Sequence, residues 1–110
     1  MYTIGYTTGV FDLFYIGHLN ILCRAKENCD YLIVGVSTDE LVKGYENKAP
    51  IIPYTERRDI VEAIRYVDKV VPQETRDKIE AHLRLKFNVM FVGDDWKESP
   101  LFVETEKRFK

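Results

Sequence analysis

Residues 8–18 read TGVFDLFYIGH, and they lie between a β-rich run and a helical pattern that begins at Gly17. A strand that turns directly into a helix predicts the opening of a βαβ unit. Gly9 allows a tight backbone turn after the strand, and Gly17 removes a side chain where a ligand can approach. His18 falls in the first turn of the helix, where free N–H groups and the helix dipole favour an anion. A lone Gly-His pair would only start a helix, but the complete stretch predicts a phosphate-binding turn.

The rest of the chain repeats the alternation of strand and helix. Near-continuous apolar runs such as residues 32–36 (LIVGV) suit a sheet that is covered on both faces. Alternating strands and helices predict right-handed crossovers and a parallel sheet. We therefore expect one α/β domain over residues 1–110, a Rossmann-like parallel sheet with helices on both faces. The expected strands are residues 2–8, 31–36, 67–71 and 89–92, and the expected helices are residues 17–27, 55–66, 75–86 and 101–108.

The order of elements also indicates where a ligand would bind. In open parallel sheets, ligands bind beyond the carboxyl ends of the strands. The segments that follow the strands are therefore the candidate sites. Residues 43–53 form the longest expected loop, because Gly44, Asn47, Pro50 and Pro53 all break regular structure.

The composition limits the class of protein. The 110 residues fit one domain, and 16 basic against 18 acidic residues give a net charge of −2. This balance provides no general attraction to nucleic acid or to an anionic membrane. No apolar run approaches the ~20 residues that cross a bilayer, and the N-terminus lacks the features of a signal peptide. We expect a cytoplasmic protein without nucleic-acid or membrane partners, in which Cys23 and Cys29 are free thiols.

The opening stretch resembles the GxFDxxHxGH signature of the cytidylyltransferase branch of the HIGH-type nucleotidylyltransferase superfamily. The likeness is closest to the bacterial glycerol-3-phosphate cytidylyltransferases. Leu13 stands where adenylyltransferases of the superfamily usually have proline, which favours the cytidylyl branch. The likeness continues in the family's order through residues 37–40 (STDE), 56–58 (ERR), 64–68 (IRYVD) and 93–96 (GDDW).

This resemblance implies a reaction. A phosphate oxygen of a small phosphorylated alcohol, such as glycerol 3-phosphate, attacks the α-phosphorus of CTP, and CDP-alcohol and pyrophosphate form. Mg²⁺ is expected to accompany the triphosphate. The sequence contains no dedicated metal cage, and Asp12 is the nearest candidate for a contact through water. The family also implies a homodimer.

The resemblance further assigns residues to the site. It implies catalytic roles for His18, Tyr15 and Arg57. For Arg65 and Lys78, a solvated surface position remains an open alternative to contact with the second substrate. The residues implied to bind CTP are Gly9, Val10, Phe11, Asp12, Ile16, Gly17, Lys48, Asp94, Asp95 and Trp96, and those implied to bind the second substrate are Lys43, Arg65 and Lys78.

Arg57 stands out without any family argument. Val61 and Ile64 lie at i+4 and i+7 from it, which places Arg57 on the apolar face of its helix, at the end near the carboxyl edge of the strands. Thr55 is the expected N-cap of this helix. A guanidinium in that position needs an anionic partner, because an unpaired buried charge is unfavourable. The partner is either a phosphate of CTP or a carboxylate in a structural salt bridge.

Two features depart from the family pattern. Tyr15 replaces the first histidine of the signature, and a phenol with a reference pKa near ~10 stays neutral at pH 7. Loss of one preorganised donor typically costs ~10²–10³ in turnover. The printed sequence ends at Lys110, before a second signature resembling RTEGISTT, so we expect the last strand and helix of the family fold to be absent. A catalytically impaired or inactive nucleotide-binding domain is therefore the alternative function.

Overall fold

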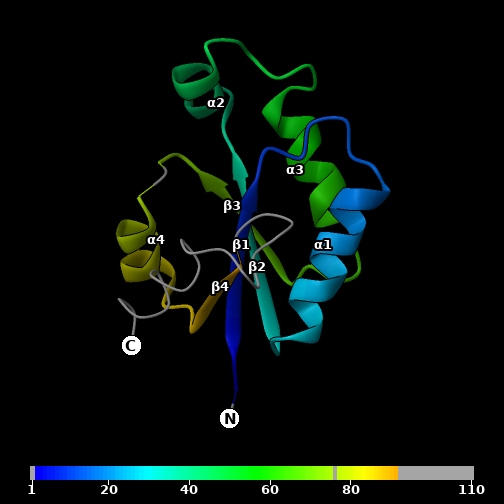
Figure 1. The fold of residues 1–110 in the computed structure, drawn as a ribbon, viewed down its shortest axis with the longest axis vertical. Helices are drawn as coiled ribbons and strands as arrows, with labels where there is room; N and C mark the ends of the chain where they lie inside the picture. Colours follow the sequence, from blue (N-terminus) through cyan, green and yellow to red (C-terminus); the bar gives the residue numbers. More distant parts are fainter. Residues whose placement is uncertain (1, 76, 92–110) are drawn as a thin grey trace.

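The computed structural model describes residues 2–75 and 77–91 of the chain. Within this part, the strands form one parallel sheet in the order β3-β2-β1-β4 (Figure 1). The strands are β1 (Ile4–Gly9), β2 (Tyr31–Ser37), β3 (Lys69–Gln73) and β4 (Val89–Phe91). The helices are α1 (Ile16–Glu27), α2 (Asp39–Glu46), α3 (Tyr54–Glu62) and α4 (Lys78–Leu85). The helix expected at residues 101–108 lies outside the described residues.

Helices cover both faces of the sheet, as the sequence predicts. Helices α1 and α3 lie on one face and α4 lies on the other, while α2 stands beyond the carboxyl end of the strands (Figure 1). The first face buries Leu22 of α1 and Val61 of α3 against β2. The second face buries Ala81 of α4, and the rings of Tyr6 and Phe87 stack there at 4.9 Å. The prediction of a parallel α/β sheet is confirmed.

The middle of the sheet is its most buried part. Residues 32–37 of β2 are all buried, because β1 and β3 flank the strand and helices cover both of its faces. Hydrophobic burial contributes roughly 25 cal/mol for each Å² of apolar surface removed from water. The central strand therefore anchors the loops that leave its carboxyl end.

Helix α2 was not expected. The sequence predicted a long loop at residues 43–53, but a helix covers Asp39–Glu46 and the connection to α3 begins only at Asn47. Thr38 caps the helix by accepting a hydrogen bond from the Leu41 amide at 3.2 Å. Gly44 costs a helix only about 1 kcal/mol relative to alanine, so it did not act as a breaker.

Other helix and strand boundaries also differ from the expectation. Helix α3 begins at Tyr54 after Pro53 and ends at Glu62, so Thr55 is not its N-cap and residues 63–66 are not helical. Strand β3 extends to Gln73 and includes Pro72, which an edge strand tolerates because it lacks a partner on one side. Helix α4 begins only after Asp77, whose carboxylate accepts the amides of two following residues.

Two simpler predictions concern thiols and membranes. Cys23 and Cys29 are free thiols, as expected. None of the helices in the described part of the chain has the length and apolar character needed to cross a bilayer.

Candidate active site

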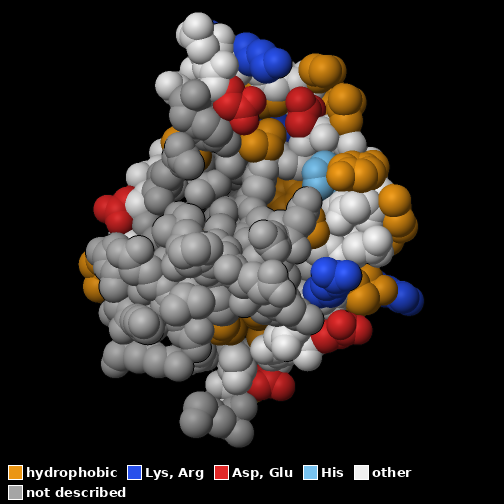
Figure 2. Space-filling view, viewed as in Figure 1, with side chains coloured by type: hydrophobic (Ala, Val, Ile, Leu, Met, Phe, Trp, Pro, Cys, Tyr) orange, Lys and Arg blue, Asp and Glu red, His pale blue; other side chains and the backbone are white. Residues whose placement is uncertain are grey.

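A cleft of about 420 Å³ opens beyond the carboxyl end of β1. One wall is the loop from β1 to α1, and the other is the end of α2 with the segment that follows it. Hydrophobic side chains gather around the loops that precede α1 and α3 on this side of the molecule (Figure 2). The cleft is lined by Val10, Phe11, Asp12, His18, Val42, Glu46, Lys48, Ala49, Pro50 and Ile51.

A larger open groove of about 990 Å³ lies beside β3 and contains none of the predicted site residues. Its charged lining consists of Arg58 and four carboxylates, which would repel a phosphate. The carboxylates are Asp39, Glu40, Glu62 and Glu74. The smaller cleft is therefore the better candidate for the site.

His18 reaches this cleft from the first turn of α1. Its Nδ1 accepts a hydrogen bond from the Tyr15 backbone N–H at 3.3 Å. With Nδ1 as an acceptor, Nε2 is the ring nitrogen that is able to donate. The rings of Phe11, Phe14 and Tyr15 surround the imidazole, with centroids 4.7–5.4 Å away. The loop therefore holds His18 with Nε2 as the donor at a helix N-terminus, where anions are favoured.

The turn that shapes the cleft is strained at two non-glycine residues. Phe11 and Leu13 have φ angles of 55° and 53°, in the left-handed region that side chains rarely adopt. Gly9 is the last residue of β1 rather than the turning residue. A Cβ on Gly9 would lie 2.9 Å from the buried ring of Phe11. Gly9 is thus required for close packing, and the strain at Phe11 is held by burial.

Asp12 crosses the cleft to the segment before α3. Its Oδ2 accepts the Ile51 amide at 2.8 Å and its Oδ1 accepts the Ile52 amide at 2.9 Å. Desolvation, the largest single influence, raises the pKa of Asp12. The two amide hydrogen bonds and the charge of Arg57 together outweigh it, so the pKa lies below its ordinary value. The carboxylate is therefore ionised and fully engaged with backbone donors.

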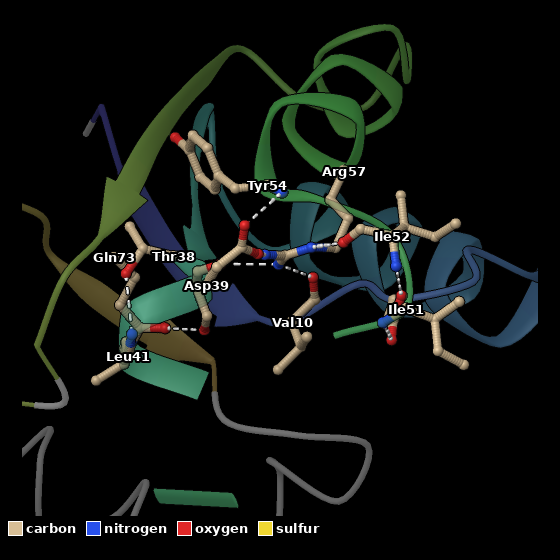
Figure 3. A network of polar contacts seen from close by, with 11 residues as sticks. Val10, Thr38, Asp39, Leu41, Ile51, Ile52, Tyr54, Arg57 and Gln73 are labelled. Atoms are coloured by element: carbon tan, nitrogen blue, oxygen red, sulfur yellow. Dashed lines mark hydrogen bonds and ion pairs between the residues drawn. The ribbon is translucent and has the colours of Figure 1, made fainter. Parts of the chain in front are cut away.

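Arg57 is completely buried and makes four hydrogen bonds (Figure 3). Its Nε donates to the Ile52 carbonyl at 2.8 Å, and Nη1 donates to the carbonyls of Val10 at 2.8 Å and Ser37 at 2.7 Å. Nη2 donates to Asp39 Oδ1 at 2.6 Å. The structure thus contains the carboxylate salt bridge that the sequence left open. Arg57 does not line the cleft but supports its wall through Val10, so contact with phosphate would require these bonds to break.

Tyr15 and its neighbours lie at the rim of the cleft. The Tyr15 side chain is 60% exposed, and its ring fills the space above Gly17, where a Cβ would lie 2.6 Å from the Tyr15 Cζ. Ile16 begins α1 and is also exposed. Gly17 lines a separate shallow depression on α1. These three predicted residues are near His18, but they do not line the described cleft.

The remaining predicted residues are only partly brought together. Lys48 lines the cleft, whereas Lys43 is exposed on α2 and does not. Arg65 donates to the Tyr66 hydroxyl at 2.9 Å, and its guanidinium carbon lies 5.0 Å from the centre of that ring. Lys78 begins α4, and its side chain is outside the described part of the structure. Asp94, Asp95 and Trp96 also lie outside the described residues.

Sequence reasoning missed three residues at this edge of the sheet. Asp39 binds Arg57 and also accepts the Tyr54 amide at 3.3 Å, and its place directly after β2 was the signal that could have revealed it. Glu46 and Val42 line the cleft because α2 ends there. The sequence could not place them, since α2 itself was not predicted.

A resident metal has no evident ligand set in the described part of the chain. Among residues 2–75 and 77–91, no three His, Cys, Asp or Glu side chains gather closely enough to hold an ion. Asp12 and Glu46 are the carboxylates that line the cleft, and each oxygen of Asp12 already accepts one backbone amide.

Comparisons with known proteins show the family. The cytidylyltransferase-like family model matches residues 6–109. Glycerol-3-phosphate cytidylyltransferases of Bacillus subtilis and Bacillus spizizenii are each 41% identical over 92 residues, which is 83% of this chain and 70% of theirs.

A solved structure matches the fold. The lipopolysaccharide core biosynthesis protein of Thermoplasma volcanium superposes with a TM-score of 0.81, over 96% of this chain and 87% of that one, at 23% identity. The family match and the identity to the Bacillus enzymes decide the assignment. The chain belongs to the cytidylyltransferase-like family, and it is an enzyme of the cytidylyltransferase type.

Proposed function

We propose that this protein transfers CMP from CTP to a small phosphorylated alcohol such as glycerol 3-phosphate. The observation that carries the proposal is the placement of His18, which lines the cleft from the first turn of α1. The two Bacillus relatives, named glycerol-3-phosphate cytidylyltransferases, support the choice of substrates.

The reaction requires little covalent chemistry from the protein. A phosphate oxygen of the alcohol phosphate forms a bond to the α-phosphorus of CTP, the bond from that phosphorus to the bridging oxygen breaks, and pyrophosphate leaves with the electron pair. Catalysis then depends on positioning and on donors directed at the developing charge. His18 would supply such a donor, and Lys48 would contribute a mobile positive charge in the same cleft. Mg²⁺ accompanying CTP would supply positive charge against the charge of the phosphates.

Tyr15 supports a second candidate, a family member that binds nucleotide with little turnover. Its exposed ring lies over Gly17 at the rim of the cleft rather than inside it. A cleft without a second imidazole would stabilise the transition state less well. Restoring the family residue with Tyr15→His separates the two candidates, because an impaired enzyme should gain turnover by about 10²–10³-fold whereas a pure binding domain should gain none.

The substrate assignment is tested by pyrophosphate release. We expect release with CTP and Mg²⁺, and much less with ATP, when glycerol 3-phosphate, ribitol phosphate and phosphocholine are offered in turn. Turnover with ATP alone would contradict the cytidylyl assignment. Absence of turnover with every alcohol, in both the natural chain and Tyr15→His, would leave only the binding function.

The role of His18 is tested with a matched histidine outside the cleft. His18→Ala should lower kcat by about 10²–10³-fold, because one preorganised donor is lost. His82→Ala is the control, since His82 packs edge-on against Phe87 on the opposite face of the sheet. Equal rates for the two variants would contradict the proposed mechanism.

We also propose that the protein is a cytoplasmic homodimer. The apolar rim of the cleft is the surface that a second copy would cover, because an exposed cluster of large apolar side chains is unusual in a monomer. Ile16→Glu should convert a dimer into a monomer in sedimentation analysis, whereas a monomeric natural chain would contradict the proposal. The rim consists of Leu13, Tyr15, Ile16 and Ile51, each more than half exposed.

A further inference from the structure

Hydrogen bonds hold the segment between α2 and α3 (residues 47–53) to Arg57 and to the first loop, which joins β1 to α1 (residues 10–15). Ile52 takes part in them both as a donor and as an acceptor. The N–H of Ile52 donates to Asp12 Oδ1, while the carbonyl of the same residue accepts from Arg57 Nε. The neighbouring Ile51 amide donates to the other oxygen of Asp12. Both polar groups of one peptide residue are therefore fixed from opposite sides.

Both side chains that bond to Ile52, those of Asp12 and Arg57, are connected to the first loop. Asp12 belongs to it directly, and Arg57 is tied to it through the Val10 carbonyl at 2.8 Å. Arg57 cannot easily turn elsewhere, because the Ser37 carbonyl also accepts from Nη1 and Asp39 accepts from Nη2. Hydrogen bonds through Ile52 and Arg57 thus join the two walls of the cleft.

These hydrogen bonds also restrict the position of Lys48, which lines the cleft. Lys48 lies three residues before Ile51, and Pro50 between them restricts the backbone. The Ile51 side chain is 73% exposed, so its own packing contributes little to holding this segment, and Pro50 and Ile52 are only partly buried. Hydrogen bonds to Asp12 therefore supply much of what keeps the segment against the first loop.

We infer that Asp12 is a positioning residue, which clamps the segment at Ile51–Ile52 and thereby holds Lys48 in the cleft beside His18. A carboxylate suits this role because its two oxygens accept two adjacent N–H groups at once, and such charge-assisted bonds are stronger than neutral ones. The clamp itself rests on geometry alone, and its effect on catalysis rests on the proposed function.

The first test measures the clamp without any substrate. Asp12→Asn retains the size of the side chain but offers one acceptor oxygen, so it can serve only one of the two amides. Amide hydrogen exchange followed by NMR should accelerate by about tenfold or more at Ile51 and Ile52. Asp59→Asn is the matched control, because Asp59 is an exposed partner of Arg58 on α3. Unchanged exchange at both isoleucine amides in Asp12→Asn would overturn the inference.

The second test separates a clamp from a contact with metal. Asp12→Glu keeps the negative charge but moves the oxygens by one methylene, so it cannot sit on the two amides in the same way. For a clamp, Asp12→Glu and Asp12→Asn should both raise KM for CTP by about tenfold, and exchange at Ile51 and Ile52 should accelerate in both variants. If Asp12→Glu instead keeps the natural KM and exchange rates while Asp12→Asn needs more Mg²⁺ for half-maximal rate, the inference is wrong.

The third test asks whether Asp12 acts through Lys48. Lys48→Met removes the ammonium that the clamp positions. In that background, Asp12→Asn should raise KM for CTP by less than twofold, because effects of residues that act as a unit are not additive. Full additivity of the two changes would show that Asp12 acts by another route. Should the natural chain turn over no CTP, the proposed function fails, while the exchange measurement still decides the clamp.

Discussion

The two ends of the sheet are each tied together by a cation and a carboxylate, but only the carboxyl end buries its cation, while its carboxylate, Asp39, is 41% exposed. At the carboxyl end, Arg57 is fully buried and pairs with Asp39 at 2.6 Å. At the amino end, Lys26 pairs with Asp68 at the same distance of 2.6 Å, and both side chains are about a third exposed. Lys26 also donates to the Asp30 carbonyl at 2.8 Å, and Asp68 accepts the Leu32 amide at 2.8 Å.

The difference indicates what each end must achieve. Burying a guanidinium carries a large desolvation cost, which only a full set of hydrogen bonds can offset. Arg57 has that set, and two of its partners, Val10 and Ile52, belong to the segments that form the walls of the cleft. At the amino end, Asp68 lines a smaller depression of about 200 Å³, and a partly exposed lysine suffices to join α1 to the start of β3. The buried charge is thus found where loop positions matter for binding.

The largest effect should come from removing the buried charge. Arg57→Ala leaves three carbonyls without their donor and opens a cavity, so the free energy of unfolding should fall by about 3–5 kcal/mol. Urea unfolding followed by circular dichroism measures this change. The neighbouring Arg58→Ala is the control, since Arg58 is exposed and pairs only with Asp59 in the described structure, and it should change stability by less than about 1 kcal/mol. Similar losses for the two variants would contradict the distinction drawn between the ends.

The next effect concerns the strained turn at the carboxyl end. Gly9→Ala forces the buried Phe11 ring to move, because the new Cβ would lie 2.9 Å from it, and overpacking of this kind typically costs about 1–3 kcal/mol. Gly17→Ala also meets a ring, but Tyr15 is exposed and can swing outward, and alanine favours a helix by about 1 kcal/mol. Thermal unfolding should therefore show a lower Tm for Gly9→Ala and an equal or higher Tm for Gly17→Ala. A stable Gly9→Ala variant would mean that Phe11 is not held as tightly as its burial indicates.

The same contrast explains what the sequence could predict. Local patterns revealed the parallel sheet, since the apolar run at residues 32–36 and the alternation of elements depend only on nearby residues. The patterns also placed Arg57 on the buried face of α3. They could not reveal its partner, because Asp39 is 18 residues away and reaches Arg57 only through the packing of α2 and α3.

The site was predictable in its chemistry but not in its geometry. His18, Asp12 and Lys48 were named from the sequence, and all three line the cleft. Tyr15 was assigned beside His18, yet rotation about its side-chain bonds places the ring over Gly17, and no local pattern determines that choice. The two positive φ angles fall on Phe11 and Leu13 rather than on a glycine, because tertiary packing overrides the local preference.

The smallest effect should come from the amino end and should depend on pH. The hydrogen bond to Asp68 raises the pKa of Lys26 above its ordinary value of 10.5. Burial raises the pKa of Asp68, but the hydrogen bonds from Lys26 and the Leu32 amide outweigh it and leave that pKa below 3.8. The contribution of Asp68 to folding stability is therefore complete above the pKa that it has in the unfolded chain, and it is lost as pH falls through the pKa that it has in the folded protein. The contribution of Lys26 to folding stability is complete below pH 10.5, and it is lost as pH rises through the pKa of Lys26 in the folded protein.

The pair should therefore stabilise the protein fully between about pH 5 and pH 9, with a coupling of about 0.2–1 kcal/mol because both side chains are partly exposed. A double-mutant cycle with Lys26→Met and Asp68→Asn, measured by urea unfolding, isolates this coupling from the bonds to Asp30 and Leu32. The coupling should be present at pH 7, shrink below pH 4 as Asp68 becomes protonated, and weaken further in 1 M salt. A coupling free energy as large as the loss of stability in Arg57→Ala, or one that did not change with salt concentration, would contradict this prediction. It would mean that the amino end also depends on a buried charge, so the contrast between the two ends would no longer hold.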